Sequence, residues 1–216
     1  MARRRAAARI LPERWYRRDA LEVARDLIGK RLVAGEVTLR ITEVEAYRYP
    51  GDSANHCRFG RTARNAPMWG PPGRAYLYLC YGMHWMLNLV TGPEGEGAAV
   101  LVRAAEPCQE GAAGLELIIA RRRWTRRVGP ALLTGPGKVA AALGLWAVHN
   151  DRPLFRAGGP LVVCDGPAPA ALLAGPRVGI DYADPADRAA PWRIADAASD
   201  WVSVRKTLVP IDGEID

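Results

Sequence analysis

Two glutamates in one strand-like segment constrain this chain more than any other feature of its sequence. The alternation of side chains across a β-strand predicts that Leu39, Ile41, Glu43, Glu45 and Tyr47 share one face. An unpaired buried carboxylate costs several kcal/mol, so this face must either emerge into solvent or line a polar cavity. Solvated glutamates at a strand end are the simpler interpretation of the segment alone. The rest of the sequence favours a cavity, and we expect the active site here.

The length of the chain indicates a single domain. With 216 residues, the chain can bury about 70% of the surface that it exposes when unfolded, which is enough for a sizeable core. We find no internal repeat and no linker-like segment. Stretches with helical and strand periodicity are interspersed, so the sequence predicts one mixed α/β domain.

Arginine dominates the charge of the chain. The sequence has 30 Lys and Arg against 23 Asp and Glu, and the resulting net charge of +7 suits a polyanionic partner. Residues 1–18 hold seven arginines and one glutamate. We expect them to form a basic, mobile N-terminal arm ahead of a single domain at residues 19–216. A targeting presequence is the competing interpretation.

Cysteine usage and hydropathy exclude several classes of protein. The four cysteines contain no Cys-x-x-Cys pair, so we expect a reducing cytoplasm and no disulfide framework. The one conceivable zinc set, His56, Cys57, Cys80 and His84, lacks paired spacing, and we expect no metal and no cofactor. Polar residues interrupt the long uncharged stretch at 75–93, and no secretory signal is present. We therefore expect no membrane association.

Local signals predict the order of helices and strands. Asp19 caps a helix that Gly29 ends, and Gly82 marks the turn of a hairpin. Residues 48–73 are too irregular for a helix or strand and too long for an idle connection, so they predict a functional loop. Residues 167–176 predict a second loop. We expect strands at 31–33, 37–47, 75–80, 85–90, 98–105, 160–165, 177–180, 191–193 and 201–203, and further helices at 111–123 and 133–143.

A mixture of chemical groups that a hydrophobic core seldom needs lies within sixty positions. It consists of a carboxylate, several rings, two hydrogen-bonding groups and a cation: Glu45, Tyr47, His56, Tyr78, Tyr81, Asn88 and Arg103. Charged groups beside aromatic rings cluster at functional sites. Each residue also has a structural interpretation, such as sheet packing or an ion pair, but the joint occurrence favours function.

These residues lie in motifs that resemble the alkyladenine (3-methyladenine) DNA glycosylases, which remove alkylated and deaminated purines. The resemblance covers roughly residues 19–209 and weakens at 108–128 and 146–175. Cys57 and Phe59 depart from it locally. The motifs are Glu43-Val-Glu-Ala-Tyr47, His56, Gly60-Arg61, Arg64-Asn65, Tyr76-Leu-Tyr78, Tyr81-Gly-Met83, Asn88, Val100-Leu-Val-Arg103, Glu106-Pro107, Gly135-Pro-Gly-Lys138, Arg177-Val-Gly179 and Pro191 through Ser203.

The resemblance implies an α+β fold: a single domain with a curved, mostly antiparallel β-sheet or open barrel, flanked by helices, with a protruding β-hairpin. It also implies roles for three residues in hydrolysis of a purine N-glycosidic bond. Glu45 would act as the base that activates a water, Arg103 would hold that carboxylate ionised and help to orient the water, and the backbone carbonyl of Val178 would complete the water site.

The resemblance further implies how a base is selected. The extruded purine would lie between Tyr47 on one side and His56 with Tyr78 on the other, and Asn88 would exclude normal guanine. Tyr81, with Met83, would enter the duplex in place of the extruded nucleotide. We expect the DNA backbone to contact Arg61, Arg64 and Lys138.

The expected function is a monofunctional DNA repair glycosylase that flips 3-methyladenine, 7-methylguanine, hypoxanthine and ethenoadenine out of duplex DNA and leaves an abasic site. No lysine falls on a nucleophile position, so we expect no lyase activity. The expected partner is double-stranded DNA with damaged purines, and the protein is expected to be a cytoplasmic monomer. One alternative is a non-catalytic DNA damage-binding protein, and another is an RNA-directed or nucleoside hydrolase.

Overall fold

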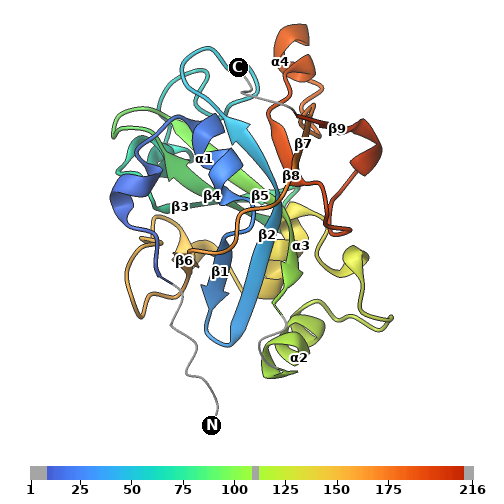
Figure 1. The fold of residues 1–216 in the computed structure, drawn as a ribbon. Helices are drawn as coiled ribbons and strands as arrows, with labels where there is room; N and C mark the ends of the chain where they lie inside the picture. Colours follow the sequence, from blue (N-terminus) through green and yellow to red (C-terminus); the bar gives the residue numbers. More distant parts are fainter. Residues whose placement is uncertain (1–8, 109–111, 212–216) are drawn as a thin grey trace.

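The structure, a computed structural model, describes residues 9–108 and 112–211. These residues form a mostly antiparallel open sheet with helices packed against it (Figure 1), which confirms the predicted α+β fold. The strands are β1 (Arg31–Ala34), β2 (Val37–Tyr47), β3 (Ala75–Cys80), β4 (His84–Thr91), β5 (Ala98–Pro107), β6 (Val162–Cys164), β7 (Leu172–Gly175), β8 (Arg193–Asp196) and β9 (Val209–Pro210). The helices are α1 (Ala20–Leu27), α2 (Ala112–Arg121), α3 (Pro136–Leu143) and α4 (Pro185–Ala189).

Strand β2 lies at the centre of the sheet. The strand order is β3-β4-β5-β2-β8-β7-β9, and β1 pairs with both β2 and β6. All of the strand pairings among these elements are antiparallel. Because β2 has β5 on one side and β8 on the other, residues of three strands meet around its C-terminal half.

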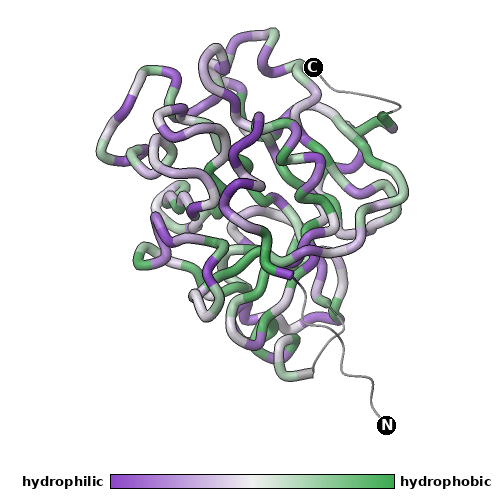
Figure 2. The backbone as a smooth tube through the Cα atoms, turned by 60° about the vertical axis from the view of Figure 1, so that its left-hand side comes forward, coloured by the Kyte–Doolittle hydropathy of each residue, from purple (hydrophilic) through white to green (hydrophobic). Residues whose placement is uncertain are grey.

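Helices α1 and α3 cover the sheet through short apolar faces. The side chain of Asp19 accepts a hydrogen bond of 2.8 Å from the backbone N–H of Leu21, which confirms the predicted N-cap of α1. Helix α3 ends at Gly144, whose φ of +71° is the left-handed conformation typical of a C-cap. Hydrophobic residues concentrate on the inner strands and hydrophilic residues on the outer loops (Figure 2).

The side chains of β2 do not share faces in the predicted way. The pairing of β2 with β5 shifts register on either side of Glu43. At this bulge the neighbouring side chains of Thr42 and Glu43 both form hydrogen bonds to residues 201–203, so they point to the same side of the strand. Val44 packs in the same hydrophobic core as Ile41. The expectation that Leu39 and Ile41 share a face with Glu43, Glu45 and Tyr47 is therefore wrong.

The C-terminal third differs most from expectation. Residues 177–180 and 201–203 are not strands. The backbone N–H groups of Val178 and Ser203 donate hydrogen bonds to the side chains of Glu45 and Glu43. The chain also turns at Gly179, whose φ is +78°. The predicted loop at 167–176 instead contains β7, whose apolar residues pair with β8. Strand β8 begins only at Arg193.

Part of the predicted N-terminal arm packs against the domain. Residues 1–8 lie outside the described residues. Residues 9–18 pack on the domain, because Leu11 and Tyr16 are buried and Ile10 forms a β-bridge with Cys164. The expected boundary at residue 19 is therefore wrong for residues 9–18.

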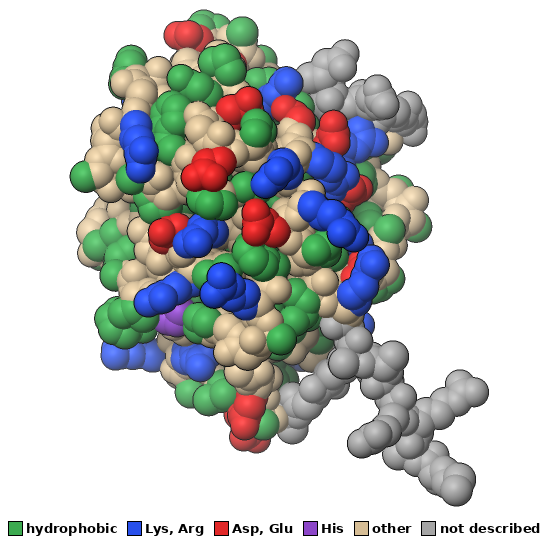
Figure 3. Space-filling view, turned by 90° about the vertical axis from the view of Figure 1, so that its left-hand side faces the viewer, with side chains coloured by type: hydrophobic (Ala, Val, Ile, Leu, Met, Phe, Trp, Pro, Cys, Tyr) green, Lys and Arg blue, Asp and Glu red, His purple; other side chains and the backbone are tan. Residues whose placement is uncertain are grey.

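Basic and acidic side chains are interspersed on the face that carries the N-terminal segment (Figure 3), so the positive charge does not form a single-signed surface there. In the described ranges, no helix combines the length and apolar character needed to cross a bilayer. In the described residues no disulfide joins any two of the cysteines Cys57, Cys80, Cys108 and Cys164.

Candidate active site

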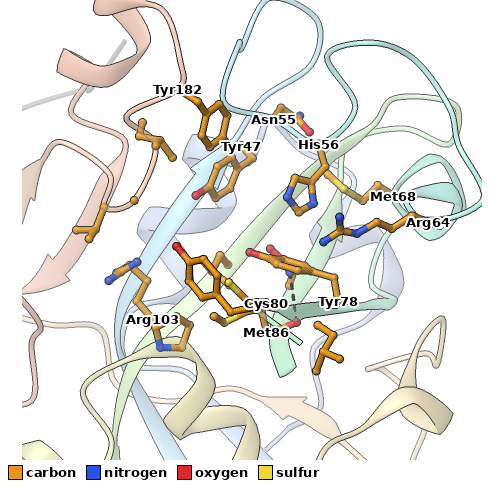
Figure 4. Close-up of a pocket in the computed structure, with 18 residues that line it drawn as sticks. Tyr47, Asn55, His56, Arg64, Met68, Tyr78, Cys80, Met86, Arg103 and Tyr182 are labelled. Atoms are coloured by element: carbon orange, nitrogen blue, oxygen red, sulfur yellow. Dashed lines mark hydrogen bonds between the residues drawn. The ribbon is translucent and has the colours of Figure 1, made fainter. Parts of the chain in front are cut away.

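Three aromatic rings from separate parts of the chain surround one cavity of about 500 Å³. Tyr47 ends β2, Tyr78 lies on β3, and His56 comes from the long loop between these strands. The ring centroids of His56 and Tyr78 are 4.6 Å apart at an interplanar angle of 71°. Figure 4 shows the three rings around a common space. The cavity has the size of a small-molecule site, which is roughly 300–1,000 Å³.

Glu45 lies directly beneath this cavity and is fully buried. Its Oε1 atom is 3.2 Å from Arg103 Nη1 and accepts a hydrogen bond of 2.7 Å from the backbone N–H of Val178. Its Oε2 atom accepts a hydrogen bond of 2.9 Å from the hydroxyl of Tyr47. Tyr47, Arg103 and Val178 all line the cavity, whereas Glu45 itself does not, so Glu45 reaches the cavity wall through its three partners.

Val178 thus contacts Glu45 through its amide. The sequence resemblance implied a role for the backbone carbonyl of this residue. A carboxylate has about four acceptor positions, and three are occupied by Val178, Arg103 and Tyr47. One position on Glu45 therefore remains for a further donor.

Glu43, the second glutamate of β2, has a different environment. Its carboxylate accepts hydrogen bonds from Arg193 Nη1 at 2.9 Å and from the Ser203 N–H and hydroxyl at 2.6 and 2.9 Å. Arg103 Nε lies 3.4 Å away. Neither glutamate lines the cavity itself, but all three partners of Glu45 do, whereas Arg103 is the only partner of Glu43 that lines it among the described residues. Since its oxygens are saturated by fixed partners, Glu43 is a structural carboxylate, and Glu45 is the one next to the cavity.

Arg103 connects the two carboxylates. It stands on β5 at the position that the register shift leaves without a partner on β2. Burial lowers the pKa of its guanidinium, but the negative charges of Glu45 and Glu43 outweigh burial and raise that pKa. The cation is therefore stable at 7% exposure, and it compensates both buried anions.

His56 is a neutral hydrogen-bonding group in this environment. Burial, followed by the positive charges of Arg64 and Arg58, lowers its pKa to about 4. Its Nδ1 atom lies 3.0 Å from the hydroxyl of Tyr76. The pKa of Tyr47 is raised well above its usual value by burial and by Glu45, so its hydroxyl keeps the proton that it donates to Glu45.

Asn88 lines the cavity from β4 and is 4% exposed. Its Nδ2 atom donates a hydrogen bond of 3.1 Å to the backbone oxygen of Tyr76, its partner across the β3–β4 pair. This bond fixes the orientation of the amide. The Asn88 side chain is therefore a rigid part of the cavity wall.

The hairpin of β3 and β4 exposes large side chains at its tip. Tyr81 is 87% exposed and Met83 is 71% exposed, although both are apolar or aromatic. Tyr81 has a φ of +50°, a conformation that costs a non-glycine residue roughly 1–2 kcal/mol. Tyr81 also lines the cavity, so the protruding tip and the cavity adjoin.

The three predicted backbone-binding residues lie in different settings. Arg61 is exposed, and Arg64 is exposed at the cavity with its Cζ atom 5.6 Å from the centroid of the Tyr78 ring. Lys138 Nζ donates a hydrogen bond of 3.0 Å to the backbone oxygen of Ala131. Burial and the nearby charge of Arg122 lower the pKa of Lys138. The structure therefore brings Arg64, but not Lys138, to the cavity wall.

Sequence reasoning missed a buried ion pair behind Tyr47. Arg177 donates to both oxygens of Asp52, at 2.6 and 2.8 Å, and its Cζ atom lies 4.8 Å from the centroid of the Tyr47 ring. Both charged side chains are 0% exposed. The Arg177-Val-Gly179 motif was a signal for Arg177, but the sequence does not indicate that its partner is Asp52 in the loop after β2. This pair fixes the ring of Tyr47 and the start of the segment that presents Val178.

Among the residues that the structure describes, no three His, Cys, Asp or Glu side chains are grouped so that they could hold a metal ion. A ring-walled cavity above a buried carboxylate–arginine pair, beside a hairpin that exposes a tyrosine, is the arrangement expected of a DNA glycosylase.

Comparisons with known proteins identify the family. Residues 14–200 match the family model described as methylpurine-DNA glycosylase (MPG). A candidate 3-methyladenine DNA glycosylase of Nitrosococcus oceani is 61% identical over 201 residues, which cover 93% of this chain and 96% of that protein. The DNA-3-methyladenine glycosylase of Arabidopsis thaliana is 48% identical over 204 residues, which cover 94% of this chain and 78% of that protein.

A third relative, from Methanocella arvoryzae, is likewise a candidate 3-methyladenine DNA glycosylase and is 47% identical over 200 residues, which cover 91% of this chain and 96% of that protein. The chain belongs to the methylpurine-DNA glycosylase family, a family of DNA repair enzymes.

Proposed function

We propose that this protein excises damaged purines, among them 3-methyladenine, 7-methylguanine, hypoxanthine and ethenoadenine, from duplex DNA by hydrolysis of the N-glycosidic bond. The observation that carries the proposal is the position of Glu45, which is buried against Arg103 directly below an aromatic cavity. The names of the relatives support a methylated adenine as one substrate.

The chemistry follows from the partners of Glu45. Its remaining acceptor position takes a proton from a water, while the oxygen of that water forms a bond to the sugar C1′ atom. The bond between C1′ and the base nitrogen breaks, and its electron pair leaves with the base. Arg103 and the Val178 amide hold the carboxylate in place for this step. An alkylated purine already carries a positive charge and leaves without a strong acid.

Base recognition depends on the walls of the cavity. The purine stacks between Tyr47 and the pair formed by His56 and Tyr78, at roughly 1–3 kcal/mol per base. The fixed amide of Asn88 excludes the exocyclic amine of normal guanine. Because extrusion of a base costs a few kcal/mol, weakly paired damaged bases are favoured. Tyr81 and Met83, exposed at the hairpin tip, fill the space in the duplex.

We propose a monofunctional, monomeric enzyme that acts in the cytoplasm and leaves an abasic site. The cavity lining includes no lysine, so no amine is placed for a Schiff base with the sugar. Arg61 and Arg64 contact phosphates near the cavity mouth, and Lys138 contributes only if it releases the carbonyl of Ala131. A non-catalytic damage-binding protein would need no buried carboxylate beneath its base pocket.

The test is base release from defined DNA. The protein is incubated, without added metal, with duplexes that contain hypoxanthine or 3-methyladenine, and free base and strand breaks are measured separately. We expect free base and intact abasic strands. Tight binding of these duplexes without any free base would support the damage-binding alternative instead, and activity on free nucleosides would support a nucleoside hydrolase.

A further inference from the structure

A second recess, of about 360 Å³, adjoins the aromatic cavity. His56, Arg64 and Tyr182 line both hollows, whereas Arg58 and Phe59 line only the second one. The two hollows therefore share a wall. A polymer that is bound with one unit in the cavity can therefore place a neighbouring unit in the recess.

The recess carries a large exposed ring beside a planar cation. Phe59 is 88% exposed, more than any other large hydrophobic side chain in the described ranges. The Arg58 Cζ atom lies 4.6 Å from the centroid of the Phe59 ring and 5.1 Å from that of Tyr182. Aromatic rings and guanidinium planes of this kind are surfaces on which unpaired nucleobases stack.

The backbone beneath these side chains is held firmly. Asn65 is 2% exposed, and its side chain donates to the backbone oxygens of His56 and Gly60 at 2.9 and 3.0 Å. Its Oδ1 atom accepts a hydrogen bond of 2.7 Å from the N–H of Thr62. Residues 58–64, which are exposed except for Gly60 and are here called the rim loop, are therefore presented on a fixed backbone. Binding loses less entropy when the contact residues are preorganised.

The charge of the rim loop is not compensated. Arg58, Arg61 and Arg64 are exposed, and in the described part of the chain no carboxylate lies within ion-pairing distance of any of them. Other surface arginines, such as Arg18 and Arg74, do have such partners. Three guanidinium groups without a carboxylate partner among the described residues, around an exposed ring, match a phosphodiester chain with a base that is free to stack.

We propose that the rim loop is a second DNA contact, in which Phe59 stacks on the base next to the extruded purine while Arg58, Arg61 and Arg64 bind the phosphates around it. This inference rests on the proposed function, because it requires DNA at the aromatic cavity. The neighbouring base must leave its own stack to reach Phe59. The rim loop therefore favours damaged purines that have an unpaired neighbour.

The test pairs a change in the protein with a change in the DNA. Binding is measured for duplexes that contain an abasic analogue at the lesion position, with the neighbouring nucleotide on the 5′ or the 3′ side either unpaired and intact or itself abasic. The protein variants are Phe59→Ala and Phe59→Trp. Trp146→Ala is the control, because Trp146 is 54% exposed and lines neither hollow.

We expect Phe59→Ala to weaken binding about tenfold when the neighbouring base is present on one of the two sides, and not at all when that base is missing. Phe59→Trp should retain the affinity, and Trp146→Ala should leave both values unchanged. An equal effect of Phe59→Ala on DNA with and without the neighbouring base, or no effect on either, would overturn the proposal. Base release by the wild-type protein is scored separately, so failure of the rim loop is distinguishable from failure of the proposed function.

Discussion

The hydroxyl of Tyr47 donates a hydrogen bond of 2.9 Å to Glu45 Oε2, so the ring that forms one wall of the cavity is tied to the carboxylate beneath it. The two residues lie two positions apart on β2, beyond the bulge at Glu43. One short stretch of strand thus supplies both a stacking surface and the proposed base. Changes in the ring and changes in the hydroxyl should have separable effects.

Tyr47→Phe tests this separation. The variant keeps the ring but removes a hydrogen bond to a charged group, which is worth roughly 1.5–3 kcal/mol. We expect the rate of base release under single-turnover conditions to fall about tenfold to a hundredfold, with binding of an abasic analogue retained. Tyr47→Leu should also weaken binding of the damaged base. An unchanged rate for Tyr47→Phe would show that the hydroxyl does not matter to Glu45.

Arg177→Met tests the ion pair behind Tyr47. The variant leaves Asp52 buried without its partner, and we expect a loss of roughly 3–5 kcal/mol in the free energy of unfolding. Arg17→Met, which removes an exposed pair with Glu13, is the matched control and should cost about 1 kcal/mol or less. Chemical denaturation measures both. Equal stability of the two variants would contradict the structural role given to Arg177.

The pKa of His56 predicts a pH dependence. In the unfolded chain the imidazole titrates at its usual value of about 6.5, and in the folded protein its pKa is lowered to about 4. Between these values the unfolded chain binds more protons, so the free energy of unfolding falls as the pH decreases from about 6.5 toward 4. The variant His56→Gln should lose less stability over this range.

The direct measurement is an NMR titration of the His56 ring, assigned by comparison with His56→Gln. Removal of a nearby positive charge in Arg64→Ala should raise the pKa of His56, because Arg64 lowers it in the native protein. A His56 pKa near 6.5 in the wild-type protein would contradict the burial of the ring.

Tyr81→Ser tests the hairpin tip. The side chain is exposed and makes no contribution to the core, so the folded structure should tolerate the change. We expect slower base release from fully paired duplexes, and a much smaller effect when the damaged purine lies in single-stranded DNA, where no gap in the helix needs to be filled. Equal effects on both substrates would argue against a wedge.

The sequence predicted local features of the fold better than long-range ones. The N-cap of α1 at Asp19 and the hairpin at Gly82 follow from short-range chemistry, and both are present. The bulge at Glu43 depends on the pairing of β2 with β5, which sequence alternation cannot show. The strand at Leu172–Gly175 is short, and the residues before it in the sequence are proline and alanine. The local sequence therefore does not predict a strand, which forms by pairing with β8.

The same limit applies to the site. The structure places Arg103, Tyr47, His56 and Tyr78 around one cavity and Glu45 against Arg103, so residues that the motifs single out lie close together. The distinct environments of Glu43 and Glu45 could not be inferred, because they depend on Ser203 and Arg193 at the far end of the chain. The Asp52 partner of Arg177 was hidden for the same reason: it lies 125 positions away.

The most direct test of the role of Glu45 is the single-turnover rate of base release by Glu45→Gln from a hypoxanthine-containing duplex. The amide keeps the size of the side chain but cannot take a proton from water, so we expect the rate to fall at least about a hundredfold. The Glu45→Gln variant should still bind a duplex with an abasic analogue as tightly as the wild-type protein does. Release of base by Glu45→Gln at the wild-type rate would contradict the assignment of Glu45 as the catalytic base.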